Sequence, residues 1–235
     1  MNSKSVGIII PTTGNPIVFD AIKSAVTQTY ENIKVYLVVD GEEYSNIFFQ
    51  MKDHDKMVVY YLPENTGKNG QNGHRIYSAF SYLINTDYIC YLDQDCFYDS
   101  NHVKECVTTL EEHNLDWCYS LRNIVNKSGE FICQDNCESL GKHNPIFDYN
   151  LVDTNCYFLK TSVAQLVSPY FVGTWGHDRR YLQVLLDNFK NFDGTGKYTV
   201  NYRMGGSDNK VNSEFFLHYN QIIENKYKGD YPWAK

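Results

Sequence analysis

The chain has 235 residues, 43% of them hydrophobic, a length and composition that suit one α/β domain with a full core. Its formal net charge of −7 at pH 7 argues against a nucleic-acid partner, because such proteins carry a basic patch or stripe on one face. The sequence has no signal-peptide pattern and no apolar run long enough to cross a bilayer, so we expect a soluble, cytoplasmic protein without a transmembrane segment.

The first half of the chain alternates predicted strands and helices. Its expected elements are, in order, a strand at 6–10 that Pro11 ends, a helix from Asn15 and Pro16 onward, strands at 35–39 and 57–62, a helix at 74–85 and a strand from residue 88. Asn15 is a good N-cap, and Pro16 suits the first helical position. The loop 64–73 contains three glycines, which permit backbone conformations closed to other residues. This alternation is typical of a largely parallel sheet with helices on its faces.

The second half is less regular. Its expected elements are a helix around 103–110, a strand at 117–121, a turn at 127–130 that leads to Phe131 and Ile132, a strand-like run at 154–159, a short helix at 161–167, a longer helix after His177 and Asp178, and a last strand at 198–203. Between Cys133 and Asp153 the periodicity fails. Long stretches without regular structure in compact domains are usually functional or mobile loops, and we interpret this one in that way. We find no repeat and no linker that divides the chain.

The stretch from Tyr88 to Asp95 carries the clearest chemical signal. An apolar run that favours a strand stops at two carboxylates, Asp93 and Asp95, separated by one residue. In an α/β domain the carboxyl ends of the strands face the ligand crevice, and Mg²⁺ usually takes one or two carboxylates together with water and substrate phosphates. The pair therefore predicts a metal-bound diphosphate. The alternative is that both aspartates merely end a strand and begin a turn.

The cysteines suggest a reduced interior. Seven of them, an odd number, lie mostly in apolar contexts, which is typical of core thiols and not of a disulfide framework. Cys133, Cys137, His143 and Cys156 are of the residue types that bind zinc, but their spacing lacks the clear second pair of a structural zinc site, and we expect none.

Five short motifs follow one another along nearly the whole chain. They are Ile8 to Thr12, Val38 to Gly41, Asn65 to Gly67 with Arg75 after it, Tyr91 to Asp95, and Trp175 to Arg180. In this order they resemble the first strand, the second strand, the Asn-x-Gly loop, the Asp-x-Asp motif and the catalytic-base region of the nucleotide-sugar glycosyltransferases of family 2, which have the GT-A fold. Each motif alone is weak, and their order carries the resemblance.

The resemblance implies one GT-A domain over residues 1–235, an α/β domain with a mixed, mostly parallel central sheet flanked by helices. Residues 1–100 would form the nucleotide-binding half and residues 101–235 the acceptor-binding half. The implied activity is that of a metal-dependent, inverting hexosyltransferase of polysaccharide biosynthesis. It would move a sugar from a nucleotide sugar, with UDP the expected nucleotide, to a saccharide or a lipid-linked glycan, the latter through peripheral contact with the inner face of a membrane.

The same resemblance assigns roles to individual residues. Those expected to hold the nucleotide sugar are Pro11, Thr12, Asp40, Asn65, Gly67, Arg75, Asp93 and Gln94. Asp95 is expected to bind Mn²⁺ or Mg²⁺, with His218 as a further candidate ligand, and Asp178 is expected to be the base that takes the proton of the acceptor. His218 beside apolar residues also suits a structural role, and Asp178 equally suits the N-cap of the helix that begins there.

Departures from the family pattern keep a second class of function open. Only Asp40 stands where the family often has two adjacent aspartates, His177 replaces the usual Glu before the base, and Gly73-His74-Arg75 replaces Ala-Arg-Asn. The alternative is therefore a catalytically inactive nucleotide-sugar- or carbohydrate-binding protein with the same fold. A sugar nucleotidyltransferase fits less well, because it would need a Gly-rich loop with Arg and Lys directly after the first strand, where this chain has Thr12 to Pro16.

Overall fold

Strands and helices alternate through the first half of the chain in the predicted order. The computed structural model describes residues 3–45, 54–174, 176–205 and 212–234. The first elements are β1 (Val6–Thr12), α1 (Val18–Val26), β2 (Ile33–Asp40), β3 (Met57–Leu62), α2 (His74–Leu83) and β4 (Tyr88–Tyr91). The expected order of strand, helix, strand, strand, helix and strand is confirmed, although several boundaries shift.

The second half contains more elements than the first, and three of them are not predicted from the sequence. The elements are β5 (Phe97–Tyr98), α3 (His102–Glu112), β6 (Trp117–Val125), β7 (Phe131–Gln134), the 3-10 helix η2 (Thr154–Cys156), β8 (Tyr157–Lys160), α4 (Thr161–Val167), the 3-10 helix η3 (Ser168–Phe171), α5 (His177–Asn188), β9 (Phe192–Arg203) and α6 (Ser213–Tyr227). The run predicted as a strand at 154–159 divides into η2 and β8. β5, η3 and α6 are the unpredicted elements.

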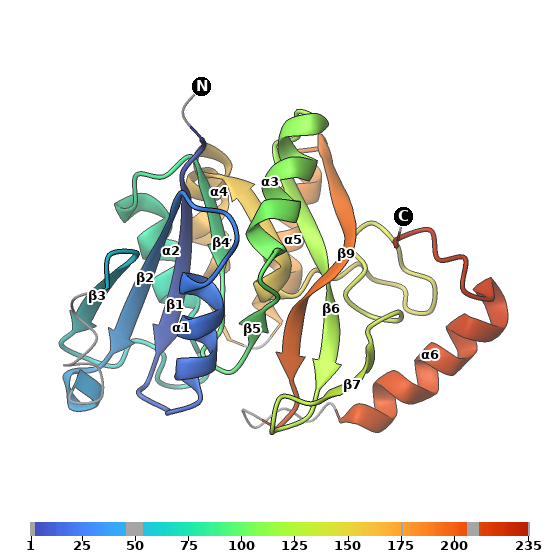
Figure 1. Cartoon of the computed structure of the whole chain (residues 1–235), viewed down its shortest axis with the longest axis horizontal. Coiled ribbons are helices and arrows are strands. Elements are labelled where there is room, and N and C mark those ends of the chain that lie inside the picture. Colours follow the sequence, from blue (N-terminus) through green and yellow to red (C-terminus); the bar gives the residue numbers. More distant parts are fainter. Residues whose placement is uncertain (1–2, 46–53, 175, 206–211, 235) are drawn as a thin grey trace.

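Nine strands among the described residues form one sheet in the order β3-β2-β1-β4-β8-β6-β9-β5, with β7 paired to β6 (Figure 1). Neighbours are parallel from β3 through β2 and β1 to β4, β8 is antiparallel to both β4 and β6, and β9 is parallel to β6. The predicted mixed sheet is thus confirmed. Because parallel strands end at one edge of a sheet, the carboxyl ends of β1, β2 and β4 lie together, where α/β domains bind ligands.

Pro11 does not end the first strand. β1 continues to Thr12, and Pro11 is the register partner of Val38 on β2. On its other side β1 pairs with β4 only from Val6 to Ile9. Proline is tolerated where one side of a strand has no neighbour, because its missing N–H then costs no ladder hydrogen bond. The prediction that Pro11 terminates the strand is therefore wrong, since the sequence does not reveal that β4 stops short.

Helices cover both faces of the sheet. α1 and α3 lie on the face toward the viewer in Figure 1, whereas α2, α4 and α5 lie behind, where η3 contacts both α2 and α5. α1 buries one stripe of residues three and four apart, namely Val18, Ala21, Ile22 and Ala25. The Asn15 carboxamide accepts a hydrogen bond from the Ile17 N–H at 3.1 Å, but α1 begins at Val18 with Ile17 as its N-cap, so the prediction that Asn15 is the N-cap is wrong.

α6 lies beside β7 at one end of the domain (Figure 1). The Asn220 amide donates to the Gln134 carbonyl at 2.6 Å and its oxygen accepts from the Asn136 N–H at 3.0 Å, which fixes the helix to the end of β7. α6 buries only Phe216 and Ile223, so the sequence lacks the full apolar stripe that would predict a helix. No helix in the described part of the chain is long and apolar enough to cross a membrane.

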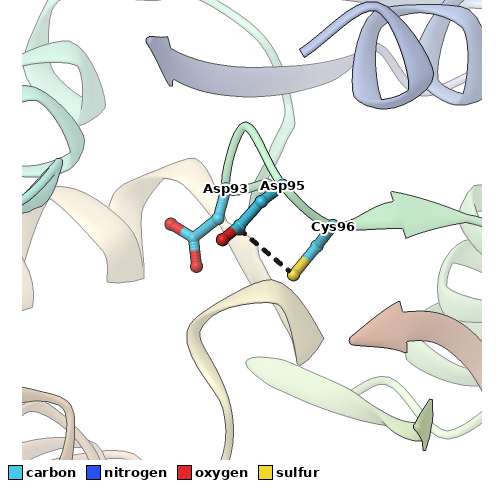
Figure 2. A group of neighbouring side chains, drawn as sticks. All are labelled: Asp93, Asp95 and Cys96. Carbon is cyan, nitrogen blue, oxygen red and sulfur yellow. Dashed lines mark hydrogen bonds between the residues drawn. The ribbon is translucent and has the colours of Figure 1, made fainter. Parts of the chain in front are cut away.

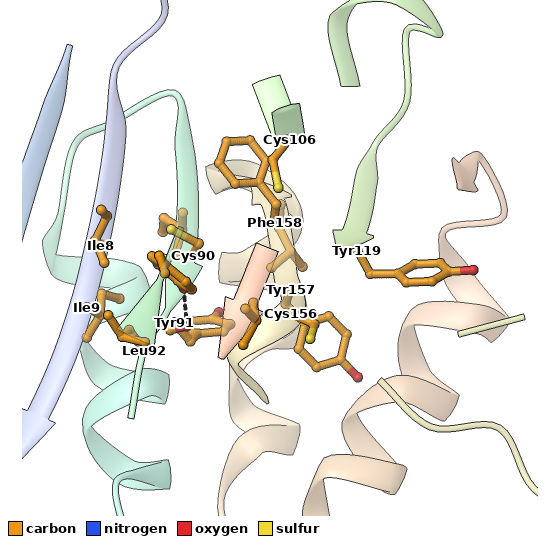
Figure 3. Packing of buried hydrophobic residues seen from close by; sticks show 14 of the residues in the cluster. Ile8, Ile9, Cys90, Tyr91, Leu92, Cys106, Tyr119, Cys156, Tyr157 and Phe158 are labelled. Atoms are coloured by element: carbon orange, nitrogen blue, oxygen red, sulfur yellow. Dashed lines mark hydrogen bonds between the residues drawn. The ribbon is translucent and has the colours of Figure 1, made fainter. Parts of the chain in front are cut away.

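The core combines aliphatic strands with aromatic rings and thiols (Figure 3). Ile8 and Ile9 of β1 lie beside Cys90 and Tyr91 of β4, and all four side chains are fully buried. Helices on both faces explain why these strands are continuously apolar and do not alternate. All seven cysteines are free, and all except Cys133 are buried, which confirms the expected core thiols.

Candidate functional site

A cavity of about 580 Å³ lies at the carboxyl ends of β1, β2 and β4. Most of the predicted site residues line it, namely Pro11, Thr12, Asp40, Asn65, Gly67, Asp93, Gln94, Asp95 and Asp178. Arg75 is exposed on α2 and donates to the Thr66 carbonyl at 3.3 Å. His218 is exposed on α6, with its ring against Tyr219. The fold therefore gathers residues that are distant in sequence, and it leaves Arg75 and His218 outside the cavity lining.

Asp40 holds the loop that follows β3. Its Oδ1 accepts hydrogen bonds from the Thr66 N–H at 2.7 Å and the Thr66 hydroxyl at 2.9 Å, and its Oδ2 accepts from the Gly67 N–H at 2.8 Å. The carboxylate is buried at the end of β2. Asp40 and the Asn65–Gly67 turn, which the sequence nominated separately, thus form one unit of the cavity wall.

The glycine loop achieves its shape differently from the prediction. Left-handed backbone occurs in this loop at Asn69, Gly70 and Asn72. Gly67 and Gly73 do not need it, and they matter because of space. A Cβ on Gly67 would lie 2.5 Å from the carbonyl oxygen of Asn72, and a Cβ on Gly73 would lie 2.6 Å from the ring of Pro11. Glycine at these two positions lets the loop fold back on itself and on the end of β1.

Gln94 connects the ends of β4 and β1. Its Oε1 accepts hydrogen bonds from the Thr12 hydroxyl at 2.8 Å and from the Thr13 N–H at 3.1 Å. The Thr12 hydroxyl in turn accepts from the Gly14 N–H at 3.0 Å. Gln94, the residue between the two aspartates, therefore attaches the turn after β4, which contains Asp93 and Asp95, to the end of β1.

Asp93 is held from two sides. Its Oδ1 accepts a hydrogen bond from the Tyr77 hydroxyl at 2.7 Å, and its Oδ2 accepts from the Asn155 amide at 3.0 Å. The Asn155 oxygen accepts from the Asp93 N–H at 2.6 Å. Burial, with the charge of Asp95 next in effect, raises the pKa of Asp93 above its usual range. Its orientation is fixed, and its charge is unfavourable without a cation nearby.

Asp95 has fewer partners. Figure 2 shows its carboxylate beside that of Asp93 and close to Cys96, whose thiol donates at 3.6 Å. Its backbone is anchored by Arg203, whose Nε donates to the Asp95 carbonyl at 3.0 Å. The same guanidinium donates to the Lys127 carbonyl at 2.8 Å and to the Asp20 carboxylate at 2.6 Å. Burial raises the pKa of Asp95.

A buried guanidinium organises the opposite wall. Arg122 on β6 donates to Asp135 at 2.8 Å, to Glu138 at 2.7 Å and to Asp153 at 2.5 Å. Asp153 Oδ1 then accepts from both the N–H and the side-chain amide of Asn155, at 3.0 and 2.8 Å. A continuous chain of hydrogen bonds thus runs from Arg122 through Asp153 and Asn155 to Asp93.

Asp178 lies in the first turn of α5 but is not its N-cap. The helix begins at His177, and the N-cap residue is Gly176, whose φ of 89° is left-handed. The Asp178 carboxylate accepts a hydrogen bond from the Arg179 N–H at 2.8 Å, and burial raises its pKa. Its charge still suits the helix N-terminus. Trp175, which the sequence placed beside it, lies outside the described residues.

The charges around the cavity are unbalanced. Its described lining contains six carboxylates and three cationic side chains, which are Asp40, Asp93, Asp95, Glu138, Asp153 and Asp178 against Lys68, Arg122 and Arg179. A diphosphate would add negative charge to this excess. A divalent cation would offset the negative charge of the carboxylates and of the diphosphate, so the residues present fit Mg²⁺ or Mn²⁺.

The candidate ligands for such a cation form one cluster. Among the described residues, Asp93, Asp95 and Cys96 are the only three potential ligand side chains whose donor atoms lie within 4.8 Å of one another. Burial raises the pKa of the Cys96 thiol well above its usual range, so the oxygen atoms of the two carboxylates are the suitable donors. His218 is not part of the cluster, and the arrangement does not support it as a ligand.

Several cavity residues received no role from the sequence, among them Lys68, His74, Arg122, Glu138 and Asp153. Arg122 had a signal, because a charged residue inside an apolar strand needs buried partners. Glu138 and Asp153 lie in the aperiodic stretch that the sequence indicates as a functional or mobile loop. The Nδ1 of His74 lies 2.8 Å from the Gly173 carbonyl oxygen, and burial lowers its pKa.

Comparison with known sequences identifies relatives. The sequence model of the family described as Glycosyl transferase family 2 matches residues 7–200. An uncharacterized glycosyltransferase of Rickettsia conorii is 26% identical over 136 residues, which cover 56% of this chain and 21% of the relative. The chain therefore spans about a fifth of the length of that curated relative.

Comparison with solved structures gives the same fold. The crystal structure of S. aureus TarS 1-349 in complex with UDP-GlcNAc matches with a TM-score of 0.68 at 14% identity, over 96% of this chain and 67% of that one. The crystal structure of S. aureus TarS matches with a TM-score of 0.65 at 11% identity, over 98% of this chain and 44% of that one. At such identities the likeness shows a shared fold alone.

Proposed function

The chain belongs to glycosyltransferase family 2 and has the expected GT-A fold, and we propose that it transfers a sugar from a nucleotide sugar to a hydroxyl of a saccharide or glycoconjugate acceptor. One observation carries the proposal. A single cavity contains Asp93 and Asp95 after β4 and Asp178 at the start of α5. The first two suit a departing diphosphate with its cation, and the third suits an incoming hydroxyl group.

The proposed donor is a UDP-sugar. The side-chain oxygen of Asn65 is buried in the cavity wall and has no hydrogen-bond partner in the described part of the chain. Such a group is costly, and the imide N–H of uracil would satisfy it. The complex of TarS 1-349 with UDP-GlcNAc, in a protein of the same fold, supports this class of donor. Lys68, exposed at the cavity, offers a cation to the phosphates.

The proposed cofactor is Mn²⁺ or Mg²⁺ held chiefly by Asp95, with Asp93 beside it. When bound, it would supply Lewis-acid stabilisation of the charge that develops on the leaving diphosphate. The protein's own residues set the geometry, because Tyr77 and Asn155 orient Asp93, while Arg203 fixes the backbone of Asp95.

Asp178 is the proposed base. Burial raises its pKa, which brings a carboxylate closer to the value that suits a base near neutral pH. It would accept the proton of the acceptor hydroxyl as that oxygen attacks the anomeric carbon, and direct attack inverts the configuration there. In this proposal residues 1–100 mainly bind the nucleotide, and residues 101–235 mainly bind the acceptor.

The deciding experiment is a nucleotide-release assay with a panel of nucleotide sugars, with and without Mn²⁺. The proposed transferase should release its nucleoside diphosphate only when the metal is present, and faster when a suitable acceptor is added. The rival hypothesis, an inactive nucleotide-sugar-binding protein, predicts binding by calorimetry without metal-dependent release. That second result would refute the proposed activity.

A further inference from the structure

One fully buried tyrosine differs from the others in its hydroxyl group. The fully buried tyrosines in the described part of the chain are Tyr77, Tyr91, Tyr119, Tyr157 and Tyr181. Tyr77 donates to Asp93, the Tyr91 and Tyr181 hydroxyls contact each other at 3.1 Å, and Tyr119 donates to the Leu140 carbonyl. The Tyr157 hydroxyl is buried without a hydrogen-bond partner among the described residues. A buried hydroxyl of this kind costs free energy, so native proteins rarely keep one without a functional reason.

Tyr157 packs on the helix that contains the proposed base. It is the first residue of β8, and its ring meets the Tyr181 ring edge to face, with the two centroids 5.2 Å apart at 78°. Tyr181 lies three residues after Asp178 in α5, and residues three apart share one face of a helix. Tyr157 therefore lies against the face of α5 to which Asp178 belongs.

The Tyr157 hydroxyl lies close enough to this carboxylate to respond to its charge. Burial raises the pKa of Tyr157 well above its usual range, and the charge of Asp178, followed by that of Asp153, adds to the rise. The Arg179 N–H donates to Asp178 Oδ1, so Oδ2 can accept from a second donor. Tyr181, on the same face of α5, already contacts the Tyr91 hydroxyl. Tyr157 is therefore the tyrosine that has a hydroxyl to offer.

Asp178 needs such a donor because its surroundings oppose its charge. Burial has the largest effect and raises the pKa of Asp178, and the charge of Asp153 raises it further. The Arg179 N–H, the Arg179 guanidinium and His74 lower it. A base must be ionised to accept a proton, and a hydrogen bond to a carboxylate stabilises the ionised form. One more donor would therefore keep Asp178 ionised at lower pH.

We propose that Tyr157 is a positioning residue for the transfer reaction, whose hydroxyl donates a hydrogen bond to Oδ2 of the ionised Asp178 and orients this carboxylate. This inference rests on the proposed function, in which Asp178 is the base. Asn155, two residues before Tyr157, orients Asp93 on the cation side of the cavity. One short segment, residues 153–157, thus supports the cation side through Asn155 and the base side through Tyr157.

The test follows the ionisation of Asp178 both directly and through catalysis. In protein labelled with ¹³C at the aspartate carboxyl carbons, the NMR resonance that is missing from Asp178→Asn identifies Asp178. Tyr157→Phe removes only the hydroxyl and should move the midpoint of this titration to higher pH by about one to two pH units, the effect of a hydrogen bond to a charged group. The pH profile of kcat/KM for nucleotide release should move in the same direction by the same amount. UDP affinity, measured by calorimetry with Mn²⁺, should stay the same.

The matched control is Tyr119→Phe, because Tyr119 is the register partner of Tyr157 on β6, is similarly buried and has a hydrogen-bonded hydroxyl. This control should keep the parent midpoints of the titration and of the pH profile. An unchanged Asp178 titration in Tyr157→Phe would overturn the proposed hydrogen bond. A shifted titration with the parent pH profile of kcat/KM would overturn the positioning role. A parent that releases no nucleotide, together with a shifted titration in Tyr157→Phe, would instead refute the proposed function and confirm the hydrogen bond.

Discussion

The two aspartates after β4 differ in how many hydrogen bonds their carboxylate oxygens accept from the protein. Asp93 accepts hydrogen bonds on both oxygens, from Tyr77 and from Asn155. Asp95 has a weak thiol partner, Cys96, as its side-chain contact. Lone pairs are therefore available on Asp95 for a cation, while Asp93 supplies negative charge at a fixed position.

Asp95→Asn should abolish most of the metal-dependent turnover. Loss of one group that stabilises developing charge typically lowers kcat by a factor on the order of 10² to 10³. The measurement is nucleotide release at saturating donor, with circular dichroism to verify the fold. Asp55→Asn, a change at an exposed aspartate, is the control and should leave the rate as it is. An unchanged rate in Asp95→Asn would remove this residue from the site.

Asp178 gives the reaction a defined pH dependence. A base works only when it is deprotonated, and burial raises the pKa of Asp178. We therefore expect kcat/KM to rise with pH, with a midpoint above the ordinary aspartate pKa of about 4. Asp178→Asn should lower kcat by roughly 10² to 10⁴ while donor affinity stays the same. Asp187→Asn changes an exposed aspartate of the same helix and should keep the parent profile. Equal losses of rate and donor affinity would favour a purely structural Asp178.

At this scale the sequence reveals residue types but not their partners. The Asp-x-Asp spacing was visible, because both aspartates lie within four residues of the end of β4. The partners of these aspartates are far away in the chain, since Asn155 lies 62 residues from Asp93 and Arg203 lies 108 residues from Asp95. Arg75 occupies the expected motif position but does not line the cavity, and its guanidinium donates to the loop carbonyl of Thr66.

Among the elements, η2 and the turn before it position a residue of the candidate site. The Asp153 carboxylate caps η2 by accepting from the Asn155 N–H, and this places the Asn155 side chain against Asp93. The position of Asp93 at the proposed cation site therefore depends on Asn155 in a capped turn, 62 residues further along the chain.

Asn155→Ala should weaken Mn²⁺ binding as well as stability. It leaves the Asp93 carboxylate and N–H without this partner, and each unsatisfied buried group costs about 1–3 kcal/mol. Calorimetric titration with Mn²⁺ and urea unfolding measure the two effects. The control, Asn123→Ala, removes a half-buried asparagine whose amide donates to the Tyr198 carbonyl and the Asn201 side chain in the sheet, and it should lower stability only. Equal Mn²⁺ affinity in both variants would show that Asn155 has no positioning role.

The elements of the first half were predictable because their apolar periodicity is strong and local. β3 matches its predicted bounds and α2 begins at the predicted residue, and in the second half α4 also matches its predicted bounds. The second half depends on contacts that periodicity does not report. The stretch after β7 is ordered by buried ion pairs with Arg122, and α6 buries too few residues to leave a pattern. The failure of periodicity between Cys133 and Asp153 was nevertheless informative, because that loop does line the cavity.

For the whole molecule, the excess of carboxylates around the cavity should make cation and nucleotide bind together. UDP alone meets repulsion, and Mn²⁺ removes it, so we expect Mn²⁺ to raise UDP affinity by about 5- to 150-fold. Thermodynamic linkage requires UDP to raise Mn²⁺ affinity by the same factor. Titrations of each ligand with and without the other close this cycle. UDP binding that is equal in EDTA and in Mn²⁺ would contradict the expectation.

The anchoring of Asp95 by Arg203 has a consequence for how the protein is made. Arg203 ends β9 and joins the backbone of Asp95 to α1 through Asp20. During synthesis, the ribosome has completed the four parallel strands of the amino-terminal half long before it adds Arg203. A nascent chain can therefore pair these four strands early, yet the turn with Asp95 acquires its support from Arg203 only after β9 has been translated.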